Sequence, residues 1–189
     1  MNITLSGGGF YIIKLTEFLL KQEKINKINI ITSSRQASEK VLDISFKENI
    51  NHFLKNNDNN IINFETIDNL DNPVYFQLVE KSDLVISLGS AWIFKKRHID
   101  ACKYLVNLHC TDLPRWRGGA PTSWRILSGI NYGSVTLHKI NESIDDGDII
   151  YKKKFIFPET CNTPIEFDNY THKVAVDFAG LIDLFSSTC

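Results

Sequence analysis

Short, continuously apolar runs alternate in this chain with longer segments of helical periodicity, and this alternation most constrains the fold. The runs at 83–88 and 104–109 are apolar at most positions, so both faces of each expected strand would be buried. Strands of that kind are typical of a parallel sheet that helices cover on both sides. We therefore predict an α/β fold with a Rossmann-like, doubly wound and mostly parallel sheet.

The same alternation predicts where the elements lie. We expect strands at 1–5, 28–32, 61–67, 83–88 and 104–109, and helices at 10–21, 34–46, 74–81 and 96–102. Ser33 or Ser34 is the expected cap of the second helix, and a loop is expected around 56–60. The rest of the chain predicts a helix near 122–128, a β-hairpin extension from 134–140 and 149–157, and a closing C-terminal helix at 163–185.

Length and charge bound the organisation of the chain. With 189 residues, 43% of them hydrophobic, we expect a single domain spanning 1–189. Twenty-one basic and 22 acidic residues give a formal net charge of -1. This balance argues against a broad electrostatic field that would attract nucleic acid or an anionic membrane.

The spacing of the cysteines bears on metal binding, and the N-terminal sequence bears on cellular location. The four cysteines form no CxxC pair, so we expect neither a zinc site nor a disulfide framework, and no cluster of metal ligands stands elsewhere. The N-terminus lacks the pattern of a signal peptide, and no apolar stretch approaches membrane-spanning length. These features predict a cytoplasmic protein with reduced thiols.

Three glycines, at positions 7, 8 and 9, follow the first expected strand and invite a dinucleotide-binding interpretation. The GxGxxG pattern would need a third glycine at position 12, which is Ile12, and the second strand ends without an acidic residue for a ribose. We therefore interpret the triplet as a tight strand-to-helix turn and exclude it from the candidate site.

The strand end Asn107-Leu108-His109 carries the candidate chemistry, because ligands of open α/β sheets bind beyond the carboxyl ends of strands. Alternation along a strand places Asn107 and His109 on one face, roughly 6.6 Å apart, and turns Leu108 into the core. An amide N–H and a protonated imidazole can both donate to a developing oxyanion. The pair therefore favours acyl transfer.

An acid beside His109 would orient the imidazole, keep it charged and accept a proton from the nucleophile. The turn SIDDGDII contains three aspartates that can supply this acid, namely Asp145, Asp146 and Asp148. Taken singly, each candidate also has a structural explanation, as a strand end, a satisfied core histidine or a turn former.

Three stretches, NLHCTDLPRWRGGAP, VTLH and IDDGDII, together resemble the folate-dependent formyltransferase family. That family includes methionyl-tRNA, glycinamide ribonucleotide and sugar N-formyltransferases, and the resemblance is specific from about 84 to 157. It implies the formyltransferase fold, 10-formyltetrahydrofolate as co-substrate, and Asn107, His109 and Asp145 as catalytic residues. Asp146 and Asp148 fit the motif less well.

Two positions depart from the family pattern. Thr111-Asp112 stands where many members have Ser-Leu, and Cys110 stands where Gly or Pro is common. Both departures leave the catalytic residues intact and concern the shape of the acceptor side.

The resemblance also implies a folate pocket with two walls. The expected contacts are Ser90, Trp92, Ile93 and Phe94 on one wall and Ser143 and Ile144 on the other. On the acceptor side, the expected substrate-binding residues are Arg115, Arg117, Gly118 and Lys139. The three basic residues are candidates for phosphate contacts, with a solvated basic face as the alternative for each.

The acceptor is expected to be a small amine. Methionyl-tRNA formyltransferase usually carries a further C-terminal domain that helps hold the tRNA, whereas this chain ends soon after the core. A net charge of -1 also argues against tRNA as the acceptor. The motifs are especially similar to enzymes that act on 4-amino sugar nucleotides. We therefore expect a nucleotide-linked amino sugar, such as a dTDP-4-amino-4,6-dideoxyhexose destined for a surface polysaccharide.

Other functions stay open at this point. Glycinamide ribonucleotide is the second candidate acceptor and methionyl-tRNA the third. The alternative to an enzyme is an inactive binding or regulatory module with the same fold. The oligomeric state also stays open, with a homodimer as one arrangement.

Overall fold

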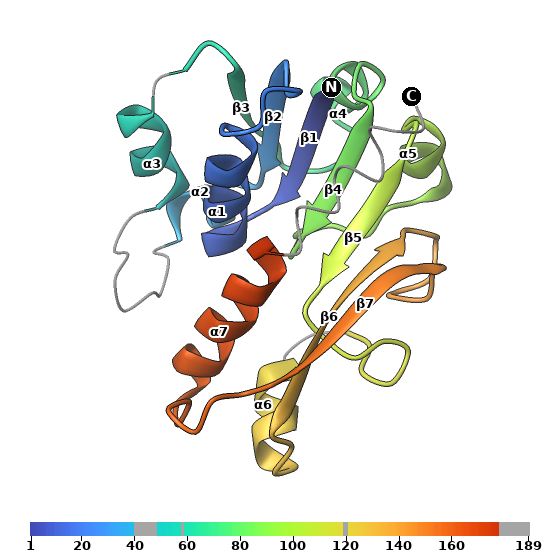
Figure 1. Cartoon of the computed structure of the whole chain (residues 1–189). Coiled ribbons are helices and arrows are strands. Elements are labelled where there is room, and N and C mark those ends of the chain that lie inside the picture. The colour runs from blue at the N-terminus through green and yellow to red at the C-terminus, as the bar shows by residue number, and fades with distance from the viewer. Residues whose placement is uncertain (40–48, 58, 119–120, 178–189) are drawn as a thin grey trace.

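The computed structural model describes residues 1–39, 49–57, 59–118 and 121–177, which form one seven-stranded sheet with helices on both faces (Figure 1). The strands are β1 (Asn2–Gly7), β2 (Lys27–Thr32), β3 (Ile62–Thr66), β4 (Leu84–Leu88), β5 (Leu105–His109), β6 (Tyr132–Lys139) and β7 (Ile149–Ile156). Their order is β3-β2-β1-β4-β5-β6-β7, parallel from β3 to β5 and antiparallel from β5 to β7. The predicted α/β fold with a mostly parallel sheet and a hairpin extension is confirmed.

Helices cover the two faces of the sheet. They are α1 (Gly9–Leu19), α2 (Ser34–Ser38), α3 (Ile50–Asn56), α4 (Pro73–Val79), α5 (Lys96–Asp100), α6 (Pro121–Leu127) and α7 (Pro164–Asp177). On one face, α1, α3 and α7 bury side chains in a large hydrophobic cluster, and on the other, α4 and the chain before α5 bury Tyr75 and Phe94. Among the described residues, no helix is both long and apolar enough to cross a membrane.

The central strands supply both clusters, which explains their continuously apolar sequences. In β4, Leu84 and Ile86 face the larger cluster while Val85 faces the other, and none of the three is more than 5% exposed. Each such side chain contributes roughly 1.5–3 kcal/mol by leaving water. Burial of both faces therefore fixes the parallel half of the sheet.

The chain after β2 differs most from the predicted elements. Ser33 caps α2, because its hydroxyl accepts the backbone N–H of Gln36 at 3.2 Å, but the helix ends at Ser38 and Glu39 is extended. The predicted continuation of this helix through 40–46 lies outside the described residues. The short helix α3 begins after its cap Asn49 and was covered by no predicted element. Residues 178–185 of the predicted closing helix also lie outside the described part of the chain.

The glycine triplet after β1 serves close packing. A Cβ at Gly7 would stand 1.9 Å from the carbonyl oxygen of Leu88, the last residue of the neighbouring strand β4. The backbone N–H of Gly8 donates to that same oxygen at 3.3 Å. The triplet therefore lets α1 start directly against β4, in agreement with the tight turn expected from the sequence.

Candidate active site

The carboxyl end of β5 and the hairpin strand β6 build the centre of the candidate site. In their antiparallel register, Asn107 lies opposite His138 and His109 lies opposite Thr136. Leu108, between them, is 8% exposed and packs in the larger hydrophobic cluster on the other face. Residues directly opposite in paired strands share a face of the sheet. The pairing therefore adds the His138 side chain to the predicted pair of Asn107 and His109.

Asp145 reaches this pair from the loop between β6 and β7. Its Oδ2 atom accepts the backbone N–H of Gly118 at 2.9 Å and lies 3.5 Å from Nε2 of His109. Its Oδ1 atom accepts a hydrogen bond from Nδ2 of Asn107 at 3.4 Å. The structure thus brings together the three residues that the motif implies. The side chains of the two alternative aspartates, Asp146 and Asp148, are instead paired with surface cations.

The backbone of this loop fixes the position of Asp145. Asp145 itself has a φ of 49°, in the left-handed region that non-glycine residues seldom adopt. Two residues later, a Cβ at Gly147 would stand 1.8 Å from the carbonyl oxygen of Lys139. The Asp-x-Gly spacing therefore reflects a turn that folds back onto the end of β6.

His109 is largely buried, and its state is set mainly by burial. Burial lowers the pKa of His109 below its usual value and His138 lowers it further, whereas Asp145 and a hydrogen bond to the Trp116 backbone raise it. The sequence predicts that Asp145 keeps the imidazole charged, but desolvation of the charged form outweighs this attraction. His109 is therefore mainly neutral at neutral pH in the free protein.

The orientation of the His109 ring follows from its hydrogen bonds. Nε2 is buried and forms no hydrogen bond with any described residue, so the bond to the Trp116 backbone uses Nδ1. A neutral ring with its proton on Nδ1 leaves the lone pair of Nε2 directed at the site. Buried polar atoms are normally hydrogen-bonded, so this atom is suited to meet a bound molecule.

His138 is the last residue of the motif VTLH, to which the sequence assigns no role. Its ring is 2% exposed, with Nδ1 2.8 Å from the carbonyl oxygen of Lys139 and Nε2 3.1 Å from Nδ2 of Asn107. A carbonyl only accepts, so Nδ1 carries the proton and Nε2 accepts from the Asn107 amide. The side chain of His138 thereby fixes which way the Asn107 amide points.

The loop after β5 folds over the site and is held by residues where this chain departs from the family pattern. Thr111 donates to the Trp116 carbonyl at 2.6 Å, which closes the loop on itself. The buried side chain of Asp112 pairs with Lys152 at 2.8 Å and with Lys154 at 2.9 Å. Burial raises the pKa of Asp112, but the two lysines outweigh it and hold that pKa below its usual value. Asp112 therefore ties the loop to β7.

A pocket of about 630 Å³ opens over these side chains. It is lined by the three motif residues, by Gly118 and by all six side chains expected to contact folate, namely Ser90, Trp92, Ile93, Phe94, Ser143 and Ile144. The pocket also reaches residues that the sequence did not single out, including Tyr11, Thr122, Ser123, Asp168 and His172. These come from α1, α6 and α7, where their spacing gives no local signal of a site.

The three basic residues expected to contact phosphates do not line this pocket. Arg115 donates to the hydroxyl of Tyr132 at 3.1 Å, and Arg117 pairs with Asp146 at 2.5 Å. Lys139 is largely exposed and lies 3.7 Å from the carboxylate of Asp148. Arg115, Arg117 and Lys139 are thus engaged with partners at the surface, and their contacts with phosphates stay predictions.

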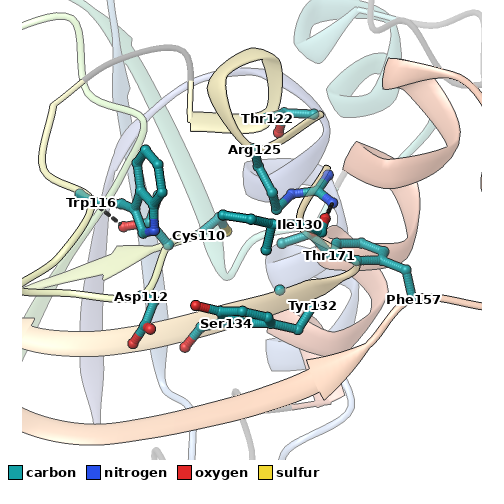
Figure 2. A pocket seen from close by; sticks show the side chains of 12 residues that line it. Cys110, Asp112, Trp116, Thr122, Arg125, Ile130, Tyr132, Ser134, Phe157 and Thr171 are labelled. Carbon is teal, nitrogen blue, oxygen red and sulfur yellow. Dashed lines mark hydrogen bonds between the residues drawn. The ribbon is translucent and has the colours of Figure 1, made fainter. Parts of the chain in front are cut away.

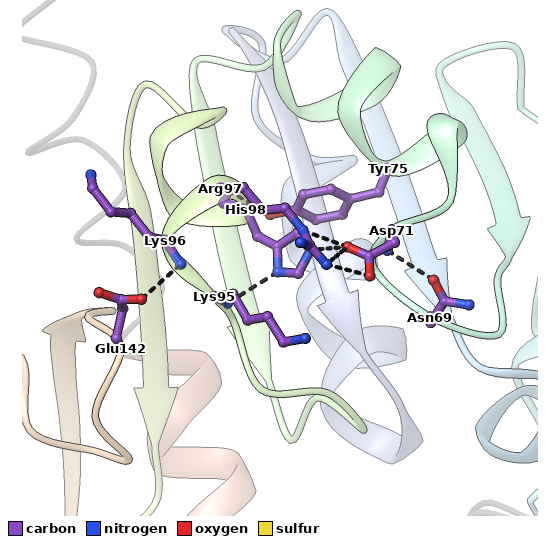
Figure 3. Close-up of polar contacts among 8 residues, drawn as sticks. All are labelled: Asn69, Asp71, Tyr75, Lys95, Lys96, Arg97, His98 and Glu142. Carbon is purple, nitrogen blue, oxygen red and sulfur yellow. Dashed lines mark hydrogen bonds and ion pairs between the residues drawn. The ribbon is translucent and has the colours of Figure 1, made fainter.

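The wall that carries Trp92 and Phe94 is anchored by a polar cluster between α4 and α5 (Figure 3). The Asp71 carboxylate accepts from the guanidinium of Arg97 and, at 2.8 Å, from Nε2 of His98. Nδ1 of His98 accepts the backbone N–H of Lys95 at 3.0 Å. The chain directly after Phe94 is therefore fixed against α5.

A second, smaller cavity of about 30 Å³ lies beneath the loop after β5 (Figure 2). The guanidinium of Arg125 borders it, 4.0 Å from the ring centre of Phe157 and 4.3 Å from that of Phe167. This volume suits about two water molecules. Among the described residues, no group of three or more His, Cys, Asp or Glu side chains is arranged to hold a metal ion.

Comparison with known proteins agrees with this geometry. The family model described as "Formyl transferase" matches residues 3–176. A methionyl-tRNA formyltransferase of Ehrlichia ruminantium (strain Gardel) is 37% identical over 81 residues, which cover 42% of this chain and 27% of that protein. The match thus spans about a quarter of the length of this curated relative.

Two solved structures share the fold. Phosphoribosylglycinamide formyltransferase from Bacillus halodurans superposes with a TM-score of 0.73 at 20% identity, covering 100% of this chain and 97% of that one. An N-formyltransferase from Helicobacter canadensis, in complex with folinic acid and dTDP-3-aminofucose, gives a TM-score of 0.69 at 21% identity, covering 100% and 65%. Since the family model spans most of the sequence, this chain belongs to the formyl transferase family.

Proposed function

We propose that this protein is an N-formyltransferase that uses 10-formyltetrahydrofolate to formylate the amine of a nucleotide-linked amino sugar. One observation carries the proposal. The unpartnered Nε2 of His109 lies beside Asn107 and Asp145 in a pocket with an apolar wall. An orphaned base next to an amide donor and a carboxylate is the arrangement that acyl transfer to an amine requires.

The pocket fits a reduced folate in size and chemistry. Its volume of about 630 Å³ is that of a small-molecule site, and Trp92, Phe94 and Ile144 give it the apolar surface that a flat ring needs. The complex of the Helicobacter canadensis relative with folinic acid supports a folate as the ligand. The co-substrate supplies the formyl group when it is bound.

Asn107 is suited to hold the oxygen on which negative charge develops. Its amide nitrogen donates to His138 at 3.1 Å and to Asp145 at 3.4 Å. The longer of these two bonds is the weaker one, so a substrate oxygen can replace Asp145 as its acceptor. His138 meanwhile keeps the amide in place.

His109 and Asp145 together manage protons. The acceptor amine loses one proton when it attacks, and the departing folate nitrogen gains one. Asp145 Oδ2 and His109 Nε2 lie 3.5 Å apart, so one bridging water, or a small approach when substrate binds, would let that proton pass between them. Because His109 starts neutral, the negative charge that develops beside it raises its proton affinity at the step where a donor is needed.

The choice of an amino sugar nucleotide draws on three observations. The motifs are especially similar to 4-amino sugar formyltransferases, and the Helicobacter canadensis structure contains dTDP-3-aminofucose. The formal net charge of -1 gives no broad field for a polyanion such as tRNA. We propose a dTDP-4-amino-4,6-dideoxyhexose as acceptor, on a route to a surface polysaccharide.

The test is an assay of tetrahydrofolate release with three acceptors and mass detection of the formyl adduct. The acceptors are dTDP-4-amino-4,6-dideoxyglucose, glycinamide ribonucleotide and methionyl-tRNA, each assayed across a salt series. We expect fastest transfer to the sugar nucleotide and a shallow dependence on salt, because a diphosphate carries few charges. Absence of transfer to all three acceptors would refute the proposed activity.

The identity with methionyl-tRNA formyltransferases favours tRNA as a second candidate acceptor. A tRNA acceptor would be formylated fastest and lose rate steeply with added salt, since many phosphates are neutralised on binding. That outcome would replace the sugar by tRNA and leave the roles of Asn107, His109 and Asp145 unchanged.

A further inference from the structure

Asp168 lines the candidate active site, and the chemistry above gives it no part. It belongs to α7 and is half-buried. Its Oδ1 atom accepts a hydrogen bond from the hydroxyl of Thr122, with the two oxygens 2.5 Å apart. No hydrogen bond to its Oδ2 is found within the described residues. Because Asp168 lines the pocket, a carboxylate oxygen without a hydrogen bond is available to a ligand.

The pocket extends across the end of the sheet, and Asp168 lies on one side of it. Trp92 and Phe94, which form the proposed folate wall, pack with the cluster under α4. Tyr11 and Asp168 come from α1 and α7, the helices that cover the opposite face. The ends of β5 and β6, with Asn107 and His138, lie between these two sides. With folate against the Trp92 wall, the side that Asp168 lines is left for the acceptor.

The groups on this side suit the hydroxyl groups of the sugar ring rather than the diphosphate of the acceptor. Among the described residues, the pocket lining contains no Lys or Arg, and its acidic side chains are Asp145 and Asp168. The hydroxyl of Tyr11 is engaged with the thiol of Cys110, and burial raises the pKa of both groups, that of Cys110 to about 12. Both therefore stay neutral, and Asp168 is the carboxyl group on this side; burial raises the pKa of Asp168, whereas Thr122 and Arg125 act to lower it.

Asp168 is held in place by the packing of α6 against α7. Thr122 and Arg125 lie on α6, and the Arg125 guanidinium packs against the ring of Phe157 (Figure 2) and also against that of Phe167. Because Phe167 adjoins Asp168 in α7, this contact and the Thr122 hydrogen bond fix the carboxylate from two directions. A recognition group that is fixed in advance loses little entropy on binding.

We propose that Asp168 determines acceptor specificity by accepting a hydrogen bond from a ring hydroxyl of the amino sugar. The inference rests on the proposed function and narrows its substrate class to amino sugars that carry a hydroxyl within reach of Asp168. A charge-assisted hydrogen bond of this kind discriminates strongly, because an analogue without the hydroxyl leaves the carboxylate desolvated and unpaired.

The test compares dTDP-4-amino-4,6-dideoxyglucose with its 2-deoxy and 3-deoxy analogues as acceptors. For the unmodified protein, we expect kcat/KM to fall by ~10- to 100-fold with one of the two analogues. In Asp168→Ala, kcat/KM for the parent sugar should drop to the value that the unmodified protein shows with that analogue. In this variant, kcat/KM for the parent sugar and for the analogue should differ by no more than about 2-fold. Stabilisation by folinic acid, measured as a shift in Tm, should stay unchanged.

Two further variants separate recognition from folding. Asp168→Asn keeps a hydrogen-bond acceptor for Thr122 and loses the charge, so we expect this variant to fold. Its discrimination between the parent sugar and the deoxy analogue should be weaker than in the original protein and stronger than in Asp168→Ala. Asp148→Ala removes a carboxylate that is 86% exposed and outside the pocket, so discrimination should stay at its original level.

The outcomes distinguish this inference from the proposed function. Transfer to the parent sugar with full discrimination retained in both Asp168 variants would overturn the role of Asp168 and leave the proposed function standing. Transfer to methionyl-tRNA alone would refute the amino sugar as the acceptor and would therefore also refute the role of Asp168.

Discussion

The parallel strands β1 and β4 are buried along nearly their whole length, whereas the edge strand β7 exposes five of its eight residues. The parallel half supplies most of the two hydrophobic clusters, and the β6–β7 hairpin supplies His138 and Asp145. Asn107 and His109 stand at the boundary, on the last parallel strand. This difference indicates that stability resides mainly in the parallel half, while the geometry of the candidate site depends on how the hairpin docks against it.

The largest expected effects concern the residues that meet at this boundary. Asn107→Ala, His109→Ala and Asp145→Asn should each lower kcat by at least ~10²-fold, because each removes a contact made in the transition state. Circular dichroism should show that each variant stays folded. Asp146→Asn is the matched control, since that side chain pairs with Arg117 at the surface, and its kcat should change little. An equal loss in Asp146→Asn would show that the acid has been misassigned.

Two glycines allow the two halves to be perturbed in the same way. An added Cβ would collide with a backbone carbonyl at Gly7, in the parallel half, and at Gly147, in the hairpin turn. We expect Gly7→Ala to lower the free energy of unfolding by about 3 kcal/mol or more, measured in urea. Gly147→Ala should cost about half as much stability but lower kcat by ~10-fold or more, because it displaces Asp145.

Gly129→Ala provides the control for backbone strain alone. Gly129 has a φ of 64° and open space where a Cβ would lie, so only about 1 kcal/mol of strain is expected. If Gly147→Ala lost as much stability as Gly7→Ala and kept normal turnover, the parallel half would not be the main source of stability, and the hairpin turn would not position Asp145.

A smaller effect should appear in the pH dependence of stability. Burial lowers the folded-state pKa of His109, so the unfolded chain binds more protons as the pH falls. The stability that neutral His109 contributes is therefore complete above its unfolded pKa of about 6.5 and is lost as pH falls. Between pH 7.5 and 5, Tm should fall by roughly 2–4 °C more in the original protein than in His109→Gln. Parallel Tm curves would contradict this.

The smallest effects are expected from the basic residues that the sequence placed at the acceptor. Arg115→Ala, Arg117→Ala and Lys139→Ala should each change kcat/KM for the sugar nucleotide by no more than about 3-fold, because none lines the pocket. A loss of 10-fold or more in any of them, measured in steady-state assays, would place that residue in the acceptor site after all.

Local sequence patterns were enough to predict most of the sheet and the placement of the candidate pair Asn107 and His109. Two-sided burial makes β4 apolar at every position except Ser87, and strand alternation alone places Asn107 and His109 on one face. The helix α3 was missed because its seven residues give too short a pattern, and only its packing against α1 and α2 makes it stable. The predicted helix at 34–46 was wrong at Glu39, where the chain becomes extended.

The sequence by itself determined the fold class, the strand that ends in Asn107-Leu108-His109 and, through its motifs, the aspartate of the hairpin turn. Only the tertiary structure decided which other groups join them. The contacts of Asp145 with Gly118 and of Asp168 with Thr122 join residues 27 and 46 positions apart, which no local periodicity records. The charge state of His109 and the surface pairing of Arg117 were likewise decided by folding, because burial and neighbouring charges set them and neither exists before the chain is packed.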